Sequence, residues 1–568
     1  MRKLKYCFSI LLLVGCQTSV EKSFHDLNEA FTAWYYKFHP VESTRYGMTD
    51  KNGFFMSINI EQNEEYIADI SRFIIELSQI DPTKLSSSDR VDYEILASKL
   101  EEMKYFMLEI RPWEWNPSWI LREIYDGLFL ISESQDIEME HRVDIVKKRL
   151  NLIPEILKES KLLISSYSKL HFEYGELIID DVIRLLDDLP LKLNSDNMTL
   201  DEIDLSIIQS KAALLDYGEW LKEKNMNLSI FNFSSDLNLM NAFPIFIGNK
   251  YLAKNVYRLA NKKINPIQNE LFKKTLPIYL MENDEPVWLD RDDTLEVIHW
   301  TIDHINNKPE NQVSHSGILT YFYESISAIE KFIYSKNVMD INTRKRIKLV
   351  YFPRYFYSSR NAEIFGEHPH KINSEIIYYI NSDNEKNDLF PLIKQEIDLL
   401  NAKNINPGKT IQIAHSQKNA FSARYMFPDL INQKGWEHYS VRMLLEQGYA
   451  SDDETYEILL LKDELKTICM GYVEGQYYSG KINKKQAISL LRSEAFLSYK
   501  EATGLIDEIE KELFSGTYSF IGMVEMESLH REYKQKMKAN YNVHDFHEAF
   551  LKHGAIPFNY LKKEILSP

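Results

Sequence analysis

Hydrophobic residues recur at intervals of three and four along most of this chain, which is the spacing of one face of an α-helix. Between Val143 and Leu162, for example, apolar side chains keep this spacing through about five helical turns. The pattern therefore predicts a mainly α-helical protein. The same period runs through Val91–Leu108, Leu200–Trp220, Leu252–Met281, Ile318–Val350, Glu454–Tyr478, Lys485–Leu497 and Glu501–Phe514.

One region departs from the helical period. Residues 351–381 are rich in aromatic and β-branched side chains and follow no helical spacing, which favours extended backbone. Elsewhere only short turn-forming stretches such as "NKPENQ" separate the helical segments, and no long linker divides the chain. We therefore expect a single large multi-helix domain with a small β excursion near residues 351–381.

Composition supports this fold class and limits the partners. Gly (19) and Pro (18) are scarce for a chain of 568 residues, whereas an all-β protein needs many tight turns. The formal net charge is −17, and an acidic surface repels the phosphate backbone of nucleic acids. We expect no nucleic-acid partner.

The N-terminal segment has the pattern of a lipoprotein signal. "MRKLKYCFSILLLVGC" begins with basic residues, continues with an apolar run too short to span a membrane, and ends in Cys16. Its last residues resemble the lipobox of bacterial lipoproteins, in which the cysteine thiol receives a lipid and becomes residue one. The resemblance implies a signal peptide (1–15), a lipidated tether (16–22) and a helical domain (23–568). Gln17 favours the outer membrane, because an aspartate there would favour the inner membrane.

Several further segments occur in the order of the motifs of a known family. "KGWEHYSVRMLLEQGY" (Lys434–Tyr449) is similar to a helix that reads EGWAxYxE, and "FHEAFLKHGAIPFNYL" (Phe546–Leu561) to a terminal FHxxxLxxGxxPL. "YVEGQYYSGKINKKQAI" is similar to a segment with VVDxxLH, and "FHPVESTRYG", "SDRVDYEIL" and "FPIFIGNKYLAKNV" to earlier segments. The chain thus resembles the bacterial domain of unknown function 885 family over nearly all of residues 23–564. The family is α-rich, with many lipoproteins and a metallopeptidase-like site.

This sequence departs from the family where that site would hold zinc. His415 aligns with the first histidine of the family motif HExxPGHH, whereas Ser416 replaces its glutamate. Phe421 and Ser422 replace the two later histidines, and Lys434 replaces the glutamate of EGW. A catalytic zinc needs three protein ligands and a base beside its bound water. We therefore expect no zinc and no zinc-dependent hydrolysis.

Other polar residues leave an alternative open. Glu437, His438 and Glu474 could join His415 in a rebuilt site if the helices bring them together, and Ser416 could act as a nucleophile. The alternative hypothesis is an active hydrolase, a peptidase, with a nonstandard site.

The interpretation we favour is binding by a retained helical framework. The ligand would be a peptide or a protein of the envelope, and the protein would be a pseudoenzyme attached to the membrane through its lipid. A surface component whose groove has no role is a third possibility. The side chains expected to line the groove are Trp436, His438, Tyr439, Glu474 and Tyr478.

Overall fold

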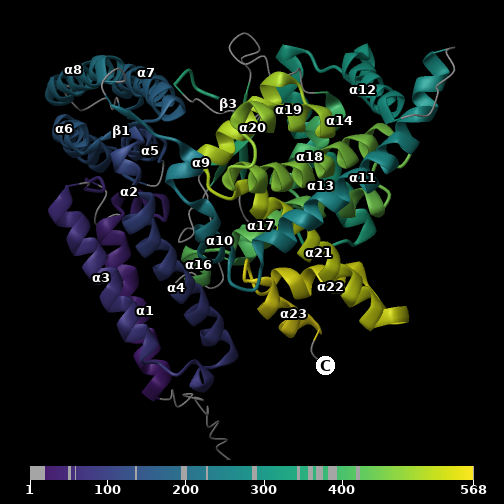
Figure 1. Cartoon of the computed structure of the whole chain (residues 1–568), viewed down its shortest axis with the longest axis horizontal. Helices are drawn as coiled ribbons and strands as arrows, with labels where there is room; N and C mark the ends of the chain where they lie inside the picture. The colour runs from purple at the N-terminus through teal and green to yellow at the C-terminus, as the bar shows by residue number, and fades with distance from the viewer. Residues whose placement is uncertain are drawn as a thin grey trace, which may run out of the picture.

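The protein is mainly α-helical, as the hydrophobic period predicted, and its strands are few and short (Figure 1). Polar side chains start many of the helices, because each accepts a hydrogen bond from a backbone N–H that the helix leaves unpaired. Asn59, Ser86, Asp429, Asn483 and Ser498 all cap in this way. The computed structural model describes residues 19–48, 53–57, 59–134, 137–193, 201–224, 228–283, 291–341, 346–355, 362–365, 375–381, 393–416 and 423–566.

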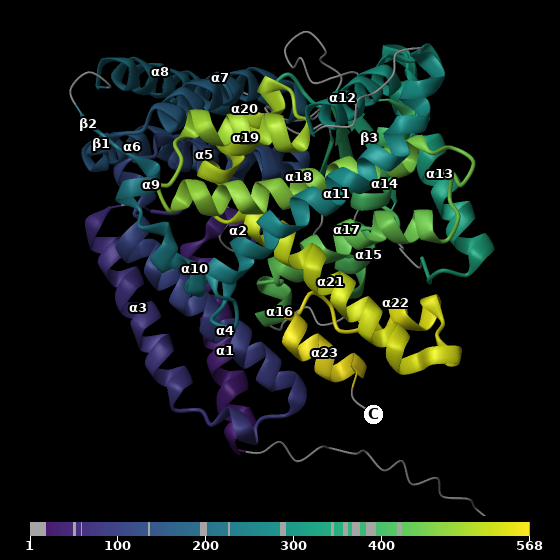
Figure 2. The ribbon, with the colours of Figure 1, turned by 45° about the vertical axis from the view of Figure 1, so that its right-hand side comes forward.

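The N-terminal part consists of two groups of helices that lie against each other (Figures 1 and 2). The first group packs around aromatic side chains, among which Phe31 contacts Trp34 and Phe73. Its first helix begins at Ser19, so the last residues of the predicted tether (16–22) are helical. The helices are α1 (Ser19–Phe38), α2 (Pro40–Arg45), α3 (Ile60–Ser78) and α4 (Ser87–Tyr105), then α5 (Pro117–Glu133), α6 (Met139–Leu163), α7 (Lys169–Lys192) and α8 (Asp201–Lys224).

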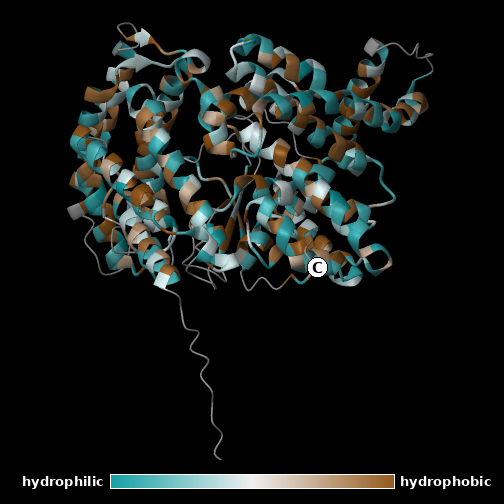
Figure 3. Ribbon diagram, turned by 60° about the horizontal axis from the view of Figure 1, so that its bottom comes forward, coloured by the Kyte–Doolittle hydropathy of each residue, from teal (hydrophilic) through white to brown (hydrophobic). Residues whose placement is uncertain are grey.

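The C-terminal part surrounds two long central helices, α17 (Leu430–Glu446) and α18 (Thr455–Tyr478), on several sides. Apolar and polar residues alternate along the helices (Figure 3), and the apolar ones form the core between them. The other helices are α9 (Phe233–Asp236), α10 (Leu239–Ile247), α11 (Ala253–Glu282), α12 (Arg291–Asn307), α13 (Ile318–Lys336), α14 (Lys394–Asn404), α15 (Lys409–Ser416), α16 (Ala423–Met426), α19 (Lys484–Ala495), α20 (Tyr499–Lys511), α21 (Ser515–Met537), α22 (Val543–Leu551) and α23 (Phe558–Leu566).

Helices α17 and α21 approach each other until their backbones touch. The contact is made by Gly435 and Gly522: a Cβ atom on Gly435 would lie 2.6 Å from the carbonyl oxygen of Gly522. A Cβ atom on Gly522 would lie 2.3 Å from the carbonyl oxygen of Ile431. Only glycine fits at this crossing, which explains the glycine of the EGW-like segment.

The extended region forms a small mixed sheet in the order β3-β5-β4, with β3 parallel and β4 antiparallel to the central strand. The sequence predicted extended backbone here but also one helix from Ile318 to Val350, and the second half of that helix is wrong. Helix α13 ends at Lys336 because Asn337 adopts a left-handed conformation (φ 50°). The strands are β3 (Ile347–Tyr351), β4 (Ala362–Phe365) and β5 (Ile376–Ile380), and a separate parallel pair is β1 (Ser166–Tyr167) and β2 (Ser229–Ile230).

None of the helices that the structure describes combines the length and the apolar character that crossing a bilayer requires.

Candidate functional site

Helix α17 is fastened to the segment that carries His415. Trp436 is completely buried, and its indole N–H donates to the backbone oxygens of Pro407 and Gly408 at 3.0 and 3.1 Å. One turn earlier, Asn432 accepts a hydrogen bond of 2.7 Å from the side chain of Gln412 on α15. These contacts make Trp436 a core residue that orients α17 and leave it no surface with which to line a groove.

Tyr439 joins α17 to the C-terminal helices. Its hydroxyl lies 3.0 Å from Nε2 of His547 and 3.4 Å from Nε2 of His530. His547 Nδ1 lies 2.9 Å from the carbonyl oxygen of Val338, which can only accept, so Nδ1 carries the proton and Nε2 accepts from Tyr439. Burial lowers the pKa of His547 to about 3 and keeps the ring neutral. Tyr439 is therefore a structural link between two of the family-like segments.

Glu474 and Tyr478 are likewise buried in the helical framework. The Glu474 carboxylate accepts from the backbone N–H groups of Gly516 (3.2 Å) and Thr517 (2.8 Å) and from the Thr517 hydroxyl. These groups lie in the first turn of α21, where the helix dipole favours a negative charge. Burial nevertheless raises the pKa of Glu474 to about 7. The Tyr478 hydroxyl donates to the carbonyl of Ile509 at 2.8 Å.

His438 contacts Asp463, a residue of α18. Its Nε2 lies 3.3 Å from Oγ1 of Thr467, and its Nδ1 lies 3.7 Å from a carboxylate oxygen of Asp463. Burial and the nearby charge of Lys403 lower the pKa of His438 to about 3, so the ring is neutral at physiological pH.

Glu437 lies one residue away in a strongly cationic setting. The ammonium group of Lys434 is 2.9 Å from its carboxylate. Burial alone would raise the pKa of Glu437, but Lys434, Lys409 and Lys403 together hold it at about 2. The lysine that replaces a family glutamate therefore neutralises the one carboxylate near it on this helix.

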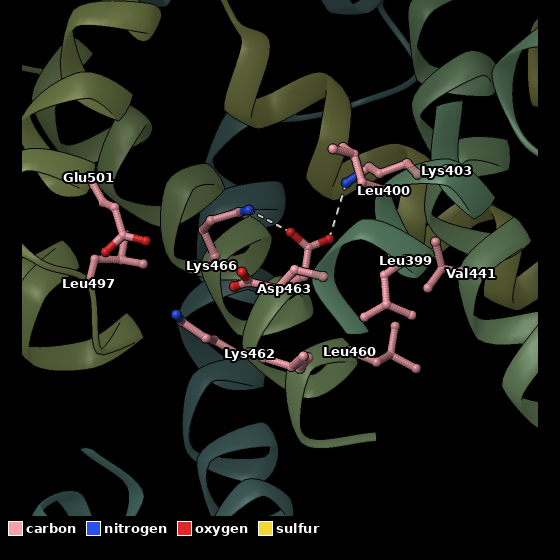
Figure 4. Close-up of a pocket in the computed structure, with 12 residues that line it drawn as sticks. Leu399, Leu400, Lys403, Val441, Leu460, Lys462, Asp463, Lys466, Leu497 and Glu501 are labelled. Carbon is pink, nitrogen blue, oxygen red and sulfur yellow. Dashed lines mark hydrogen bonds and ion pairs between the residues drawn. The ribbon is translucent and has the colours of Figure 1, made fainter. Parts of the chain in front are cut away.

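A cavity of about 270 Å³ opens between α14, α17, α18 and the start of α20, and we call it the α17 cavity (Figure 4). Asp463 lies in its wall between two lysines, 3.1 Å from Lys403 and 2.5 Å from Lys466. Burial would raise the pKa of Asp463, but these lysines hold it well below its usual range. The cavity is lined by Glu396, Leu399, Leu400, Lys403, Val441, Leu459, Leu460, Lys462, Asp463, Lys466, Leu497 and Glu501.

The wall of the α17 cavity is divided by polarity. Leu399, Leu460 and Val441 lie together on one side, whereas Leu497 lies across the cavity beside Glu501 (Figure 4). Ammonium and carboxylate groups form the other side. Val441, at the position of the last glutamate of EGWAxYxE in the sequence resemblance, belongs to the apolar side.

Among the residues expected in a rebuilt site, Glu437 and His438 are neighbours on α17, whereas Glu474 lies apart from them. Thr467 contacts His438, but Glu474 lies two turns farther along α18, about 10 Å away, and bonds to α21. His415 is half-buried in the last turn of α15. The described residues do not include the Ser416 side chain, Phe421, Ser422 or Cys16.

Sequence reasoning missed the most polar part of the cavity. Lys403 and Asp463 are 60 residues apart and belong to no motif. The spacing of Asp463 and Lys466 on one helix face was the only local signal.

One other group of side chains has the composition of a metal site. Asp340, His544 and Glu548 place their ligand atoms within 4.8 Å of one another. His544 and Glu548 lie on α22, and Glu548 belongs to the segment that resembles the family's terminal motif.

Comparison with known proteins agrees with the fold and the segment order. The sequence model of a bacterial protein family of unknown function, DUF885, matches residues 40–565. Two solved structures, both named putative lipoproteins, have the same fold. The one from Shewanella oneidensis, of unknown function, has a TM-score of 0.79 at 20% identity and covers 96% of this chain and 100% of its own. The one from Colwellia psychrerythraea has a TM-score of 0.79 at 14% identity and covers 97% and 99%. No curated protein matches the sequence.

Proposed function

Because this chain belongs to the DUF885 family of bacterial proteins, we propose that it is an envelope lipoprotein that binds peptides without zinc hydrolysis. Cys16 would carry the lipid and hold the protein at the outer membrane. The ligand would occupy the α17 cavity. The observation that carries this proposal is the charge and polarity of that cavity, with Asp463 between two lysines opposite an apolar wall.

The charges around α17 disfavour a divalent cation. Lys434 is bonded to Glu437, and Lys403 and Lys409 add positive charge close by. Two unit charges 4 Å apart interact by about 4 kcal/mol at the effective dielectric constant of a protein surface. A zinc ion at this helix would therefore be repelled by several lysines and would find few side chains available to coordinate it.

A short peptide end matches the two sides of the cavity. An apolar side chain would lie against Leu399, Leu460 and Val441, and a terminal carboxylate would reach Lys462. Lys462 lines the cavity, and its charge acts on Glu396, whose pKa is raised by burial. A volume of about 270 Å³ suits one side chain and a chain terminus better than a long segment.

Binding of peptides with an apolar C-terminal residue should depend on Lys462. Replacing Lys462 with alanine is expected to weaken binding about tenfold, since a charge-assisted contact to the carboxylate is lost. Isothermal titration calorimetry with free-acid and amidated forms of the same peptides would measure this. Lys485→Ala, an exposed lysine on α19 outside the cavity, serves as the matched control. Equal affinity of both variants and of both peptide forms would contradict the assignment.

Purified protein incubated with zinc and washed with a weak chelator should retain far less than one equivalent of metal. Elemental analysis by mass spectrometry would measure the content. The double variant Lys434→Glu/Val441→Glu restores two family carboxylates and should retain more zinc than the wild type. Stoichiometric zinc in the wild type that is lost in His415→Ala would overturn the proposal.

One observation favours the alternative of an active hydrolase. Thr467, His438 and Asp463 contact one another in the order hydroxyl, imidazole, carboxylate, which is the order of a nucleophilic triad. The Thr467 hydroxyl is buried, however, and does not line the cavity. If the wild type cleaved peptides and His438→Ala did not, the function would be catalysis and not binding alone.

A further inference from the structure

We propose a second ligand site, independent of the α17 cavity, that takes an amine with an apolar body. It is a cavity of about 440 Å³ between α4, α10 and the starts of α17 and α23, and we call it the α4 cavity. The helices that form it come from the beginning, middle and end of the chain. A cavity of this size, lined by both apolar and charged side chains, is typical of a binding site for a small molecule.

Aromatic side chains make up much of the wall. A cavity surrounded by ring faces and edges binds flat or aliphatic groups, and the ring faces also attract a cation. Lys250 already shows this preference, since its ammonium group lies over the ring of Tyr251 at 4.5 Å. The aromatic residues are Tyr35, Phe246, Tyr251, Phe427, Tyr518 and Tyr560.

Carboxylates face the cavity from two sides. Glu94 and Glu102 come from α4, and Asp429 precedes α17 on the opposite side. Their negative field reaches the tyrosines between them. Burial raises the pKa of Tyr518, and Glu102 and Asp429 raise it further. Burial and Glu94 raise the pKa of Tyr560 to about 12.

The two lysines of the wall do not balance these carboxylates. The Lys99 ammonium lies 2.7 Å from the Glu102 carboxylate and forms an ion pair with it. Burial lowers the pKa of Lys250, whereas Glu525 and Asp429 act to raise it. The lining therefore holds three carboxylates and two lysines, an excess of one acidic group. A ligand with an ammonium group would find both charge partners and ring faces there.

Three of the segments that resemble the family meet at this cavity. "FPIFIGNKYLAKNV" supplies residues 245–251, "SDRVDYEIL" supplies Glu94 and Ile95, and "FHEAFLKHGAIPFNYL" supplies residues around Tyr560. Their convergence points to a site.

Three probes of one shape and different charge test the proposal: 2-phenylethylamine, 3-phenylpropanoate and 3-phenylpropanol. We expect the amine to bind at least about tenfold tighter than the acid and the alcohol, measured by ligand-observed NMR titration on the full mature chain. Glu102→Gln should weaken amine binding about tenfold, because one carboxylate is lost and Lys99 is left without its partner. Glu101→Gln, the next residue on α4 and exposed outside the cavity, should leave binding unchanged.

A second variant separates binding from folding. Ser98 lies on the rim of the α4 cavity, and Ser98→Trp would place an indole inside it without removing a buried contact. This variant should keep the thermal midpoint of the wild type and lose the amine. Acid bound as tightly as amine, or amine binding that survives both Glu102→Gln and Ser98→Trp, would overturn the proposal. Neither result bears on peptide binding at the α17 cavity, since the two cavities share no lining residue.

Discussion

Replacing Gly435 with alanine is expected to lower the free energy of unfolding by about 3 kcal/mol or more, because α17 and α21 must move apart. The new Cβ would lie 2.6 Å from the carbonyl oxygen of Gly522, and that neighbour is backbone, which cannot rotate away. Separation of the two helices would also loosen the hydrogen bonds of Trp436 and Tyr439. Urea denaturation followed by circular dichroism would measure the loss.

Gly504 provides a control for the crossing. It is also a helical glycine, in α20, but a Cβ there would meet nothing within 4 Å. Gly504→Ala should therefore leave stability unchanged or raise it by up to about 1 kcal/mol through helix propensity. If Gly435→Ala were as stable as Gly504→Ala, the destabilisation expected from the close approach of α17 and α21 would be contradicted.

The second large effect is expected at the ion pair between α4 and α16. Asp92 and Arg424 are both buried, and the Arg424 guanidinium binds the two carboxylate oxygens at 2.9 and 3.0 Å. Removal of one partner leaves a buried charge uncompensated, so Asp92→Ala should cost about 3–5 kcal/mol. This loss should change little with ionic strength, because both side chains are about nine-tenths buried.

An exposed pair supplies the comparison. Lys148 lies 2.7 Å from Asp144 on the surface of α6. Asp144→Ala should change the unfolding free energy by less than about 1 kcal/mol. Denaturant midpoints of the two variants, at low and high salt, would measure both predictions. Similar losses at Asp92 and Asp144 would show that the α4–α16 pair does not hold the N-terminal helices to the rest of the chain.

The sequence predicted the helices well because their evidence is local. The periodic segment Glu454–Tyr478 corresponds to α18, and Leu252–Met281 corresponds to α11, each to within a residue at both ends. The helix predicted over Ile318–Val350 is wrong in its second half, because the apolar spacing continues across Asn337, where the backbone turns. Periodicity alone cannot detect such a turn.

The site was predictable only in part, because a residue type does not show which direction its side chain faces. Trp436 and Tyr439 are aromatic residues on a family-like helix, which suggested a groove. Helix α17 is covered on several sides, so these side chains are buried and hydrogen-bonded inside the protein. The charged wall of the α17 cavity depends on Lys403 and Asp463, which only the fold brings together.

The start of α1 determines how far the protein can move from its proposed anchor. Helix α1 begins at Ser19, three residues after Cys16, and it lies at one end of the molecule (Figure 2). Three residues extend over about 10 Å at most. With a lipid on Cys16, the first turn of α1 would be held next to the phospholipid headgroups. The protein could then pivot on the membrane but not drift away from it, and a peptide or amine would have to reach its cavities at the bilayer surface.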